Sequence, residues 1–346
     1  MALPKFRGGL ETLIIKNIMI KNIRKTYLII ILLTSGFTFA QPQFSEYNSM
    51  SGAFSRLGFG ARGMGMGNAM ISVVSGNLVS YYNPAVSTFQ EDNYFQTSYS
   101  FLSFDRTLNF LNFTKKLEIG NRKKRIAGIS LGIINAGVNG IDGRDNQGIK
   151  TGDLSTSENQ FFVSFSNRFS EKLSVGVGIK FYYFKLYEKI SSTALGIDVG
   201  VIYLLNKNIS LGATVTDINS KYKWDTSKLY GLEGNTTRYD FPLLFRVGAT
   251  YKFNNPHLLA TVEFEHSNAQ TNFLRLGSEY NVFEKFFLRA GVDRISISNP
   301  DIPARPSFGF SYQKNFNSFD VGINYAFVIE PYSAFASHII GVGIIF

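Results

Sequence analysis

Cysteine is absent from this chain of 346 residues, which excludes disulfides, thiol nucleophiles, lipidated cysteines and zinc sites built on thiolates. Histidine is scarce: His257, His266 and His338 are the only three, and none lies at metal-ligand spacing from another. Charged residues make up only 17% of the chain, whereas glycine (32) and phenylalanine (33) are abundant. The composition therefore favours strands over helices and predicts no metal site.

One apolar stretch lies close to the N-terminus, in "IKNIRKTYLIIILLTSGFTFAQ". Its basic flank, short apolar run and small residues before Gln41 predict a secretory signal peptide at residues 1–40, cleaved after Ala40. The run is too short to span a membrane as a helix. The start codon stays open between Met1 and Met19. Without the signal the chain has 29 basic and 24 acidic residues, so its charge gives no indication of a nucleic-acid partner.

The run "GFGARGMGMGNAM" at residues 58–70 contains a formal G-x-G-x-x-G match at Gly58, Gly60 and Gly63. A dinucleotide site needs a strand before this run and a carboxylate about 20 residues after it. The preceding "QPQFSEYNSMSGAFSRL" has no strand pattern, and "SYYNP" follows at the distance where the acid would stand. We therefore predict no cofactor and look for a structural role for these glycines.

Beyond residue 92 apolar residues recur at every second position. In "LSVGVGIKFYYFK" (173–185) one face carries Val175, Val177 and Ile179, while the other carries Gly176, Gly178 and Lys180. Such alternation predicts strands with one apolar and one polar face. About fourteen such segments fall near residues 93–104, 106–117, 124–135, 158–169, 173–186, 193–205, 209–217, 242–253, 257–266, 271–281, 286–295, 305–316, 318–328 and 337–346.

The connections between these segments alternate in length. Every second one is a short turn, whereas the others include long loops at 137–157, 219–241, 296–304 and 329–336. An even number of ten-residue strands with short turns on one side predicts an all-β transmembrane antiparallel barrel of about 14 strands, in the outer membrane of a Gram-negative bacterium. The last segment ends on Phe346, as expected of a terminal strand that signals insertion. We divide the chain into the signal peptide 1–40, an N-terminal segment 41–92 and the barrel 93–346.

The alternation also assigns charged side chains to the inner face of the barrel. A row of opposite charges on neighbouring strands is predicted from Arg246, Glu263, Arg275, Glu279, Arg289 and Asp293. The same rule turns Lys180, Asp198, Lys252, Glu265 and Asp320 inward. The row is read either as a charged conduit or as a packed lumen in which acids and bases satisfy one another. Mixed signs select no ion, so the packed lumen is favoured.

The N-terminal segment carries a resemblance to a known family. "GARGMGMGNA" (60–69), "YNPA" (82–85) and "FPLLFRVGATYKF" (241–253) resemble segments of the PorV/PorQ family and, more distantly, of FadL-type long-chain fatty acid transporters. The resemblance implies a fourteen-stranded barrel whose N-terminal segment folds into the lumen as a hatch near the periplasmic end. The expected hatch residues are Gly60, Arg62, Gly63, Gly65, Gly67, Asn83 and Pro84, and Arg62 is expected to reach Glu263, Glu279 or Asp293.

Two functions follow from the resemblance, and both place the protein in contact with outer-membrane lipid. The PorV/PorQ branch implies an accessory of type IX secretion that binds secretion-system proteins or secreted cargo. The FadL branch implies passive uptake of a hydrophobic small ligand. A third class, the enzymes, has one formal motif: "GISLG" at 128–132 matches G-x-S-x-G, but Ser130 falls in the middle of a predicted strand, where a nucleophile elbow does not form. We predict no catalytic residues.

Overall fold

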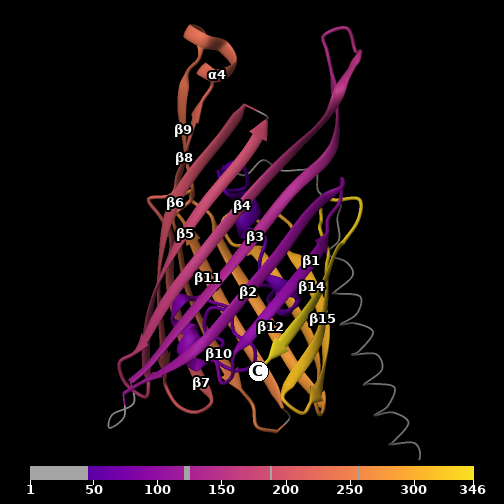
Figure 1. Ribbon diagram of the computed structural model, residues 1–346. Helices are drawn as coiled ribbons and strands as arrows, with labels where there is room; N and C mark the ends of the chain where they lie inside the picture. Colours follow the sequence, from indigo (N-terminus) through magenta and orange to yellow (C-terminus); the bar gives the residue numbers. More distant parts are fainter. Residues whose placement is uncertain (1–45, 121–124, 188, 256) are drawn as a thin grey trace, which may run out of the picture. The chain divides into compact units, whose positions relative to one another are not determined.

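The computed structural model describes residues 46–120, 125–187, 189–255 and 257–346 (Figure 1). The chain divides into two units, Met1–Gln41 and Pro42–Phe346, and all described residues belong to the second. The predicted signal peptide and the choice between two start codons lie outside the described residues.

Fourteen antiparallel strands close into one barrel, which confirms the predicted fold class. The barrel closes where the last strand pairs with the first, and the backbone of Phe346 exchanges two hydrogen bonds of 3.0 Å with Asn93. The strands are β1 (Tyr94–Phe101), β2 (Arg106–Ile119), β3 (Arg125–Arg144), β4 (Lys150–Arg168), β5 (Leu173–Tyr187), β6 (Ile190–Leu204), β7 (Ile209–Ile218), β10 (Leu244–Lys252), β11 (Leu258–Ser267), β12 (Asn272–Phe283), β13 (Phe286–Ser296), β14 (Arg305–Phe316), β15 (Phe319–Val328) and β16 (Ser337–Ile345).

The two ends of the barrel differ in their connections. The end that joins β2 to β3, β4 to β5, β6 to β7, β10 to β11, β12 to β13 and β14 to β15 is called here the short-turn end. The opposite end, the long-loop end, carries the connection from β7 to β10. That connection contains a hairpin of β8 (Lys221–Asp225) and β9 (Thr236–Asp240), with α4 (Ser227–Tyr230) and η3 (Gly231–Glu233) at its tip. The hairpin and the β3–β4 pair project furthest from the barrel (Figure 1).

The stretch 137–157 was expected to be a loop, and this expectation is wrong for most of it. Strands β3 and β4 continue to pair through Val138 and Thr156 and on to Ile141 and Leu154. Backbone hydrogen bonds suffice for this pairing. The sequence loses its alternation there because both faces of a hairpin that leaves the barrel lie in water, so no apolar face is needed. The unpredicted β8–β9 hairpin has another reason: each of its strands has only five residues, too few for alternation to mark a strand.

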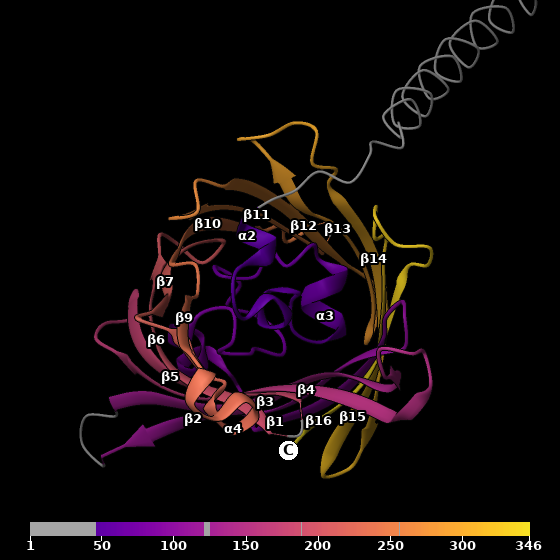
Figure 2. The ribbon, with the colours of Figure 1, turned by 90° about the horizontal axis from the view of Figure 1, so that it is seen from above.

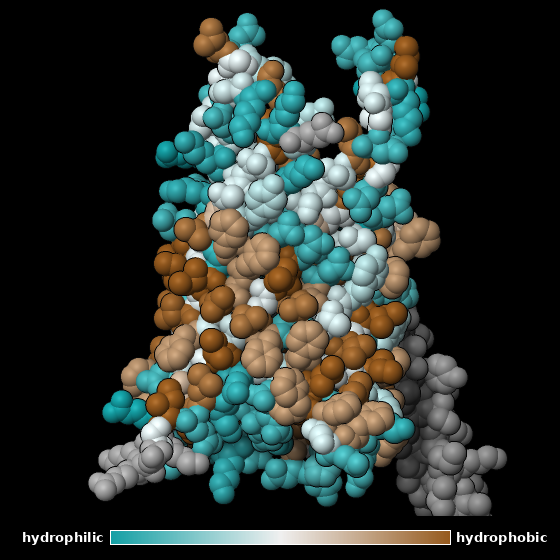
Figure 3. All heavy atoms as spheres, in the orientation of Figure 1, coloured by the Kyte–Doolittle hydropathy of each residue, from teal (hydrophilic) through white to brown (hydrophobic). Residues whose placement is uncertain are grey.

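Apolar side chains face outward from the barrel. Val177, Ile197 and Ile323 are 47%, 46% and 56% exposed on its outer surface. On the face shown in Figure 3, apolar side chains form a belt between two hydrophilic ends. This distribution is the inverse of a soluble sandwich and is typical of a barrel surrounded by lipid.

Residues 46–92, called here the lumenal segment, run inside the ring of strands (Figure 2). They form α2 (Glu46–Ser49), η1 (Ala53–Arg56), α3 (Gly60–Gly65) and η2 (Pro84–Phe89), joined by irregular chain. Asn83 caps η2 by accepting from the backbone N–H of Ala85 at 2.9 Å, and Pro84 occupies the first helical position, where its missing N–H costs nothing.

The lumenal segment is not confined to the short-turn end, as the expected hatch was. Ser51 donates a hydrogen bond of 3.4 Å to the carbonyl of Tyr239 in the hairpin at the long-loop end. Gly76 lines a hollow with Lys252 and His257 at the short-turn end. The segment therefore fills the lumen along most of its length. Close packing requires it to do so, because the side chains that face the lumen need packing partners along the whole wall.

Candidate functional site: the filled lumen and the wall beside it

The glycine-rich run packs backbone against backbone on the barrel wall. Helix α3 lies against β13 to β16 and β1. A Cβ atom on Gly65 would stand 3.4 Å from the Cα of Gly309 and 3.5 Å from the Cβ of Ala326. Gly67 has φ of +60°, and a Cβ there would lie 2.6 Å from the backbone nitrogen of Val292. Only glycine permits both this conformation and this approach.

The remaining predicted hatch residues face other parts of the lumenal segment and the wall. Gly63 lies under the ring of Tyr82, and Gly60 lies near the side-chain amide of Gln96. Asn83 donates hydrogen bonds to the carbonyls of Ile71 at 2.8 Å and Val201 at 3.1 Å. These contacts hold the second half of the segment to β6.

Arg62 connects α3 to the wall. Its guanidinium donates to both oxygens of Glu279, with distances of 2.9 Å from Nε and 2.8 Å from Nη2. It also donates to the carbonyls of Asn77 and Ser75 at 2.8 and 2.9 Å. Arg289 donates to the same carboxylate at 2.7 Å. Glu279, one of the three carboxylates expected for Arg62, thus joins two arginines, and we call the Arg62–Glu279 pair the latch.

A second charged network lies nearer the long-loop end. Arg275 donates to Glu263 at 3.0 Å, to Glu265 at 3.1 Å and to Asp293 at 2.6 Å. Arg246 lies 2.5 Å from Glu265 but 4.0 Å from Glu263, because the register places Arg246 directly opposite Glu265. The structure therefore divides the predicted row between two networks, with Glu279 and Arg289 beside Arg62 and the other four residues here, and it gives Arg246 a closer partner in Glu265 than in Glu263.

Further residues join this network, and the sequence analysis missed some of them. Arg305 binds Asp293 at 3.3 Å and pairs with Glu330. Asn68, from the lumenal segment, donates to Asp293 at 3.0 Å. Tyr47 donates to Glu265 at 3.0 Å. These groups give the buried charges the hydrogen bonds that they need in a dry lumen.

A third cluster contains two acids around one base. Lys180 lies 2.8 Å from Asp198 and 3.3 Å from Asp217, and the hydroxyl of Tyr182 donates to Asp217 at 2.5 Å. Asp217 escaped the alternation rule because it stands at an irregularity of β7 with φ of +63°. Two other residues assigned to the inner face lie near the short-turn end: Lys252 is exposed and lines a hollow with Gly76 of the lumenal segment, and Asp320 pairs with Lys285 at 3.1 Å.

The opposite side of the lumen, along β2 to β6, is aromatic. Trp224 and Tyr222 of the hairpin pack on Phe184, with ring centroids 5.2 and 5.9 Å away, and Tyr182 contacts Phe241 at 4.6 Å. Phe54 of the lumenal segment then contacts Tyr182 at 6.4 Å. Six rings share this outer group: Phe54, Tyr182, Phe184, Tyr222, Trp224 and Phe241.

An inner aromatic group continues into the lumenal segment. Phe59 contacts Phe110 at 4.9 Å, Tyr81 at 5.3 Å and Phe162 at 5.7 Å. Burial raises the pKa of Tyr81 to about 12, so its hydroxyl stays a donor, to the carbonyl of Ser55 at 2.5 Å. Both groups belong to one continuous apolar cluster. Strands β2 to β6 thus carry most of the rings that face the lumen and β10 to β14 most of the charges, with the Lys180 cluster beside Tyr182 as a charged exception.

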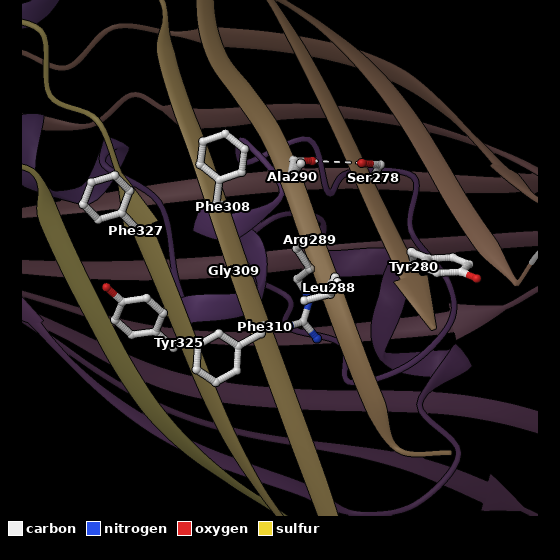
Figure 4. A pocket seen from close by; sticks show the side chains of 10 residues that line it. All are labelled: Ser278, Tyr280, Leu288, Arg289, Ala290, Phe308, Gly309, Phe310, Tyr325 and Phe327. Atoms are coloured by element: carbon white, nitrogen blue, oxygen red, sulfur yellow. Dashed lines mark hydrogen bonds between the residues drawn. The ribbon is translucent and has the colours of Figure 1, made fainter. Parts of the chain in front are cut away.

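A groove of about 540 Å³ lies on the outer face of the wall at β12 to β15 (Figure 4). Phe308, Phe310 and Tyr280 stand around it, and its floor consists of small residues, among them Ala290 and Gly309. Gly309 is the residue that Gly65 of α3 approaches from inside. At Gly309 no wall side chain separates the glycine-rich helix from the apolar groove on the outer face.

The structure offers no support for catalysis by Ser130. Its hydroxyl is buried in β3 and contacts Thr114 at 2.8 Å and Asn112 at 3.0 Å, and neither is a base. No group of three or more His, Asp or Glu side chains in the described residues is placed to hold a metal ion. Among those residues, no helix is long and apolar enough to cross a membrane.

No protein-family model and no curated protein matches the chain. Among solved structures, the toluene transporter TodX of Pseudomonas putida is similar, with a TM-score of 0.55, 15% identity and coverage of 83% of this chain and 97% of that one. A variant of TodX, a monoaromatic hydrocarbon channel, has a TM-score of 0.54 and 15% identity, with coverage of 83% of this chain and 98% of that one. A Pseudomonas aeruginosa FadL homologue has a TM-score of 0.54 and 13% identity, with coverage of 83% of this chain and 97% of that one. At these identities the likeness shows a shared fold of the FadL type; none of these structures supports the PorV/PorQ resemblance.

Proposed function

We propose that the chain is an outer-membrane channel of a Gram-negative bacterium for the passive uptake of small hydrophobic molecules, with the lumenal segment as its hatch. The observation that carries this proposal is the division of the lumen. Contact with the aromatic side is favourable for an apolar solute because it removes apolar surface from water. Contact with the charged side is unfavourable because it would break hydrogen bonds of buried charged groups. The toluene transporter and the FadL homologue with the same fold support the same choice.

The aromatic side defines a route. It starts at Trp224 in the hairpin, passes Tyr182 and Phe54, and reaches Phe59, the residue directly before α3. From there the shortest way to lipid leads past Gly65 to Gly309, behind which lies the apolar groove in the wall. A solute would follow this route if α3 moves away from β14 and β15.

The latch controls this movement in our proposal. Arg62 is the residue of α3 that reaches the wall through charged hydrogen bonds, and its side chain is only 10% exposed. Gly65 meets β14 and β15 with its backbone, but Ala61 and Met64 of α3 are buried, and Gly67 after the helix donates to Ser307 at 3.1 Å. Release of Arg62 from Glu279 removes the charged attachment of the helix, and these remaining contacts must break as well.

A reversible cross-link tests whether α3 must move. Because the chain lacks cysteine, Gly65→Cys with Ala326→Cys is the only thiol pair in the doubly substituted protein. The expected Cβ separation of 3.5 Å suits a disulfide. In a deletion strain that carries this variant, uptake of radiolabelled toluene and of a labelled long-chain fatty acid should fall on oxidation and return on reduction.

The two single-cysteine variants serve as controls, since oxidation should leave their uptake unchanged. Uptake of a small sugar, measured in parallel, should not respond to the deletion or to the cross-link. Equal uptake of both hydrophobic probes in the deletion strain and its complemented parent would refute the transport function. Uptake that persists in the fully cross-linked protein would refute the route past α3.

One observation favours a second candidate function, an accessory role in secretion. Tyr230 and Leu232 at the tip of the hairpin are 63% and 106% exposed, which is unusual for large apolar side chains and suits contact with another protein. If this role is correct, Tyr230→Ser with Leu232→Ser should weaken binding of secreted cargo or secretion-system proteins and leave hydrophobic uptake unchanged. If this variant binds cargo and secretion-system proteins as the parent does, the exposed tip gives no support to the secretion role.

A further inference from the structure

The β8–β9 hairpin has two chemically different faces. Tyr222 and Trp224 point into the aromatic side of the lumen. Lys221 and Lys223 alternate with them and so point the other way, and the register places Arg238 opposite Lys223 on the same face. One face of the hairpin is therefore aromatic and inward, and the other is basic and outward.

Hydrogen bonds fix the hairpin on the barrel wall. The hydroxyl of Ser192 in β6 donates to the carbonyl of Lys223 at 2.8 Å and accepts from its N–H at 2.9 Å. At the base of the hairpin, the N–H of Phe241 donates to the carbonyl of Ser220 at 3.0 Å. The basic face is thus held at a set position relative to the outer surface of β5 and β6.

A hollow of about 460 Å³ lies between this basic face and the wall. Lys221, Lys223 and Arg238 line it together with Phe181 and Leu195. The last two are opposite each other on β5 and β6, and they are 41% and 65% exposed on the outer, apolar surface of the barrel. Three cations thus stand directly beyond the apolar belt, on the long-loop side.

Two acids share the hairpin face. Asp240 is opposite Lys221 in the register, and Asp225 lies two residues beyond Lys223 and accepts from the N–H of Ser227 at 2.9 Å. Neither residue lines the hollow. The lining therefore presents three positive charges to an occupant and no negative charge.

We infer that this hollow binds a phosphate-bearing membrane lipid. Its acyl chain would lie on Phe181 and Leu195, and its phosphate would contact Lys221, Lys223 and Arg238. In such a lipid the charged phosphate lies at the membrane surface and the acyl chain lies in the apolar interior. The hollow has the same arrangement, with cations at the level where the barrel leaves the membrane and an apolar surface next to them. The site does not depend on transport, and it would anchor the hairpin that covers the aromatic side of the lumen.

Binding of diphosphoryl lipid A to the purified full-length barrel in detergent tests the inference, with native mass spectrometry as the readout. Lys221→Gln/Lys223→Gln/Arg238→Gln should weaken binding by at least about tenfold, given the usual contribution of a cation near a lipid phosphate. The conservative Lys221→Arg/Lys223→Arg protein should bind as the parent does. Phosphatidylcholine, whose phosphate charge is neutralised by its own choline cation, should not distinguish the three proteins.

The matched control removes three exposed lysines at the short-turn end, as Lys207→Gln/Lys252→Gln/Lys314→Gln. It changes the net charge equally and should keep lipid A binding within about twofold of the parent. Equal losses in the two triple variants, or no loss in the first, would overturn the inference. Displacement of lipid A by inorganic phosphate in modest excess would also overturn it, since the site would then select a soluble anion.

Discussion

Breaking the latch should open the hatch, whichever of its two partners is lost. Glu279 accepts from Arg62 through two hydrogen bonds and from Arg289 through one. The side chains of Glu279 and Arg62 are only 11% and 10% exposed. The pair is therefore buried enough for an uncompensated charge to be costly.

The two substitutions leave different residual charges. Glu279→Gln leaves two guanidinium groups around a neutral amide, and loss of one partner of a buried pair costs about 3–5 kcal/mol. Arg62→Met leaves the carboxylate bonded to Arg289 but removes two hydrogen bonds to a charged group, each worth about 1.5–3 kcal/mol. Because about 1.4 kcal/mol changes an equilibrium tenfold, the open fraction should rise at least about 100-fold in either variant.

Thiol labelling measures the open fraction. Met64→Cys places the only thiol of the chain in α3 at a position that is 2% exposed, so a water-soluble maleimide reacts with it only when the hatch opens. Glu279→Gln and Arg62→Met should both label faster than the parent. Arg125→Met, a change of an exposed arginine at the short-turn end, is the control and should label at the parental rate. Equal rates in all four proteins would refute the latch.

Three other substitutions test the barrel and the packing of its lumen. Val199→Arg should cost about 2–4 kcal/mol, the penalty for arginine at the bilayer midplane, seen as a lower urea midpoint in vesicles; an unchanged midpoint would exclude a lipid-facing position. Glu263→Arg alone should lower the unfolding temperature on semi-native gels more than the swap Glu263→Arg/Arg275→Glu, and equal losses would show that the two residues do not interact. Gly291→Ala brings a Cβ against the backbone of Gly67, so proteolysis of the lumenal segment should increase while the barrel stays intact; unchanged protection would contradict the close packing.

The barrel was predictable because its strands obey one rule. Side chains such as Val177 and Ile197 must face lipid, so every membrane-crossing strand shows a period of two. The rule stops where the strands leave the membrane. The outer parts of β3 and β4 therefore carried no signal, although their backbones pair as far as Arg144 and Lys150 with two shifts of register.

The lumen was predictable only in its polar part. Charges on inward positions marked Glu263 and Arg275, but the choice of Glu265 as the partner of Arg246 depends on register, which no local pattern encodes. The aromatic side was missed because Phe110 and Phe162 are apolar residues on an inward face, where the alternation rule expects polar ones. Residues that break the rule in this way are the ones that line the proposed route.

The division of the lumen also determines which part of the hatch can move. The second half is anchored: Asn83 binds Ile71 and Val201, and Thr88 donates to Ser174 of β5 at 2.9 Å. In the first half, α3 meets β14 and β15 through glycine backbone and is held to β12 by the latch. Because η2 leads into β1 within a few residues, it cannot leave without unpairing the barrel, whereas α3 can swing about it. In the proposed channel, opening at α3 would bring Phe59 next to Gly309, so that one local movement would join the aromatic side to the membrane.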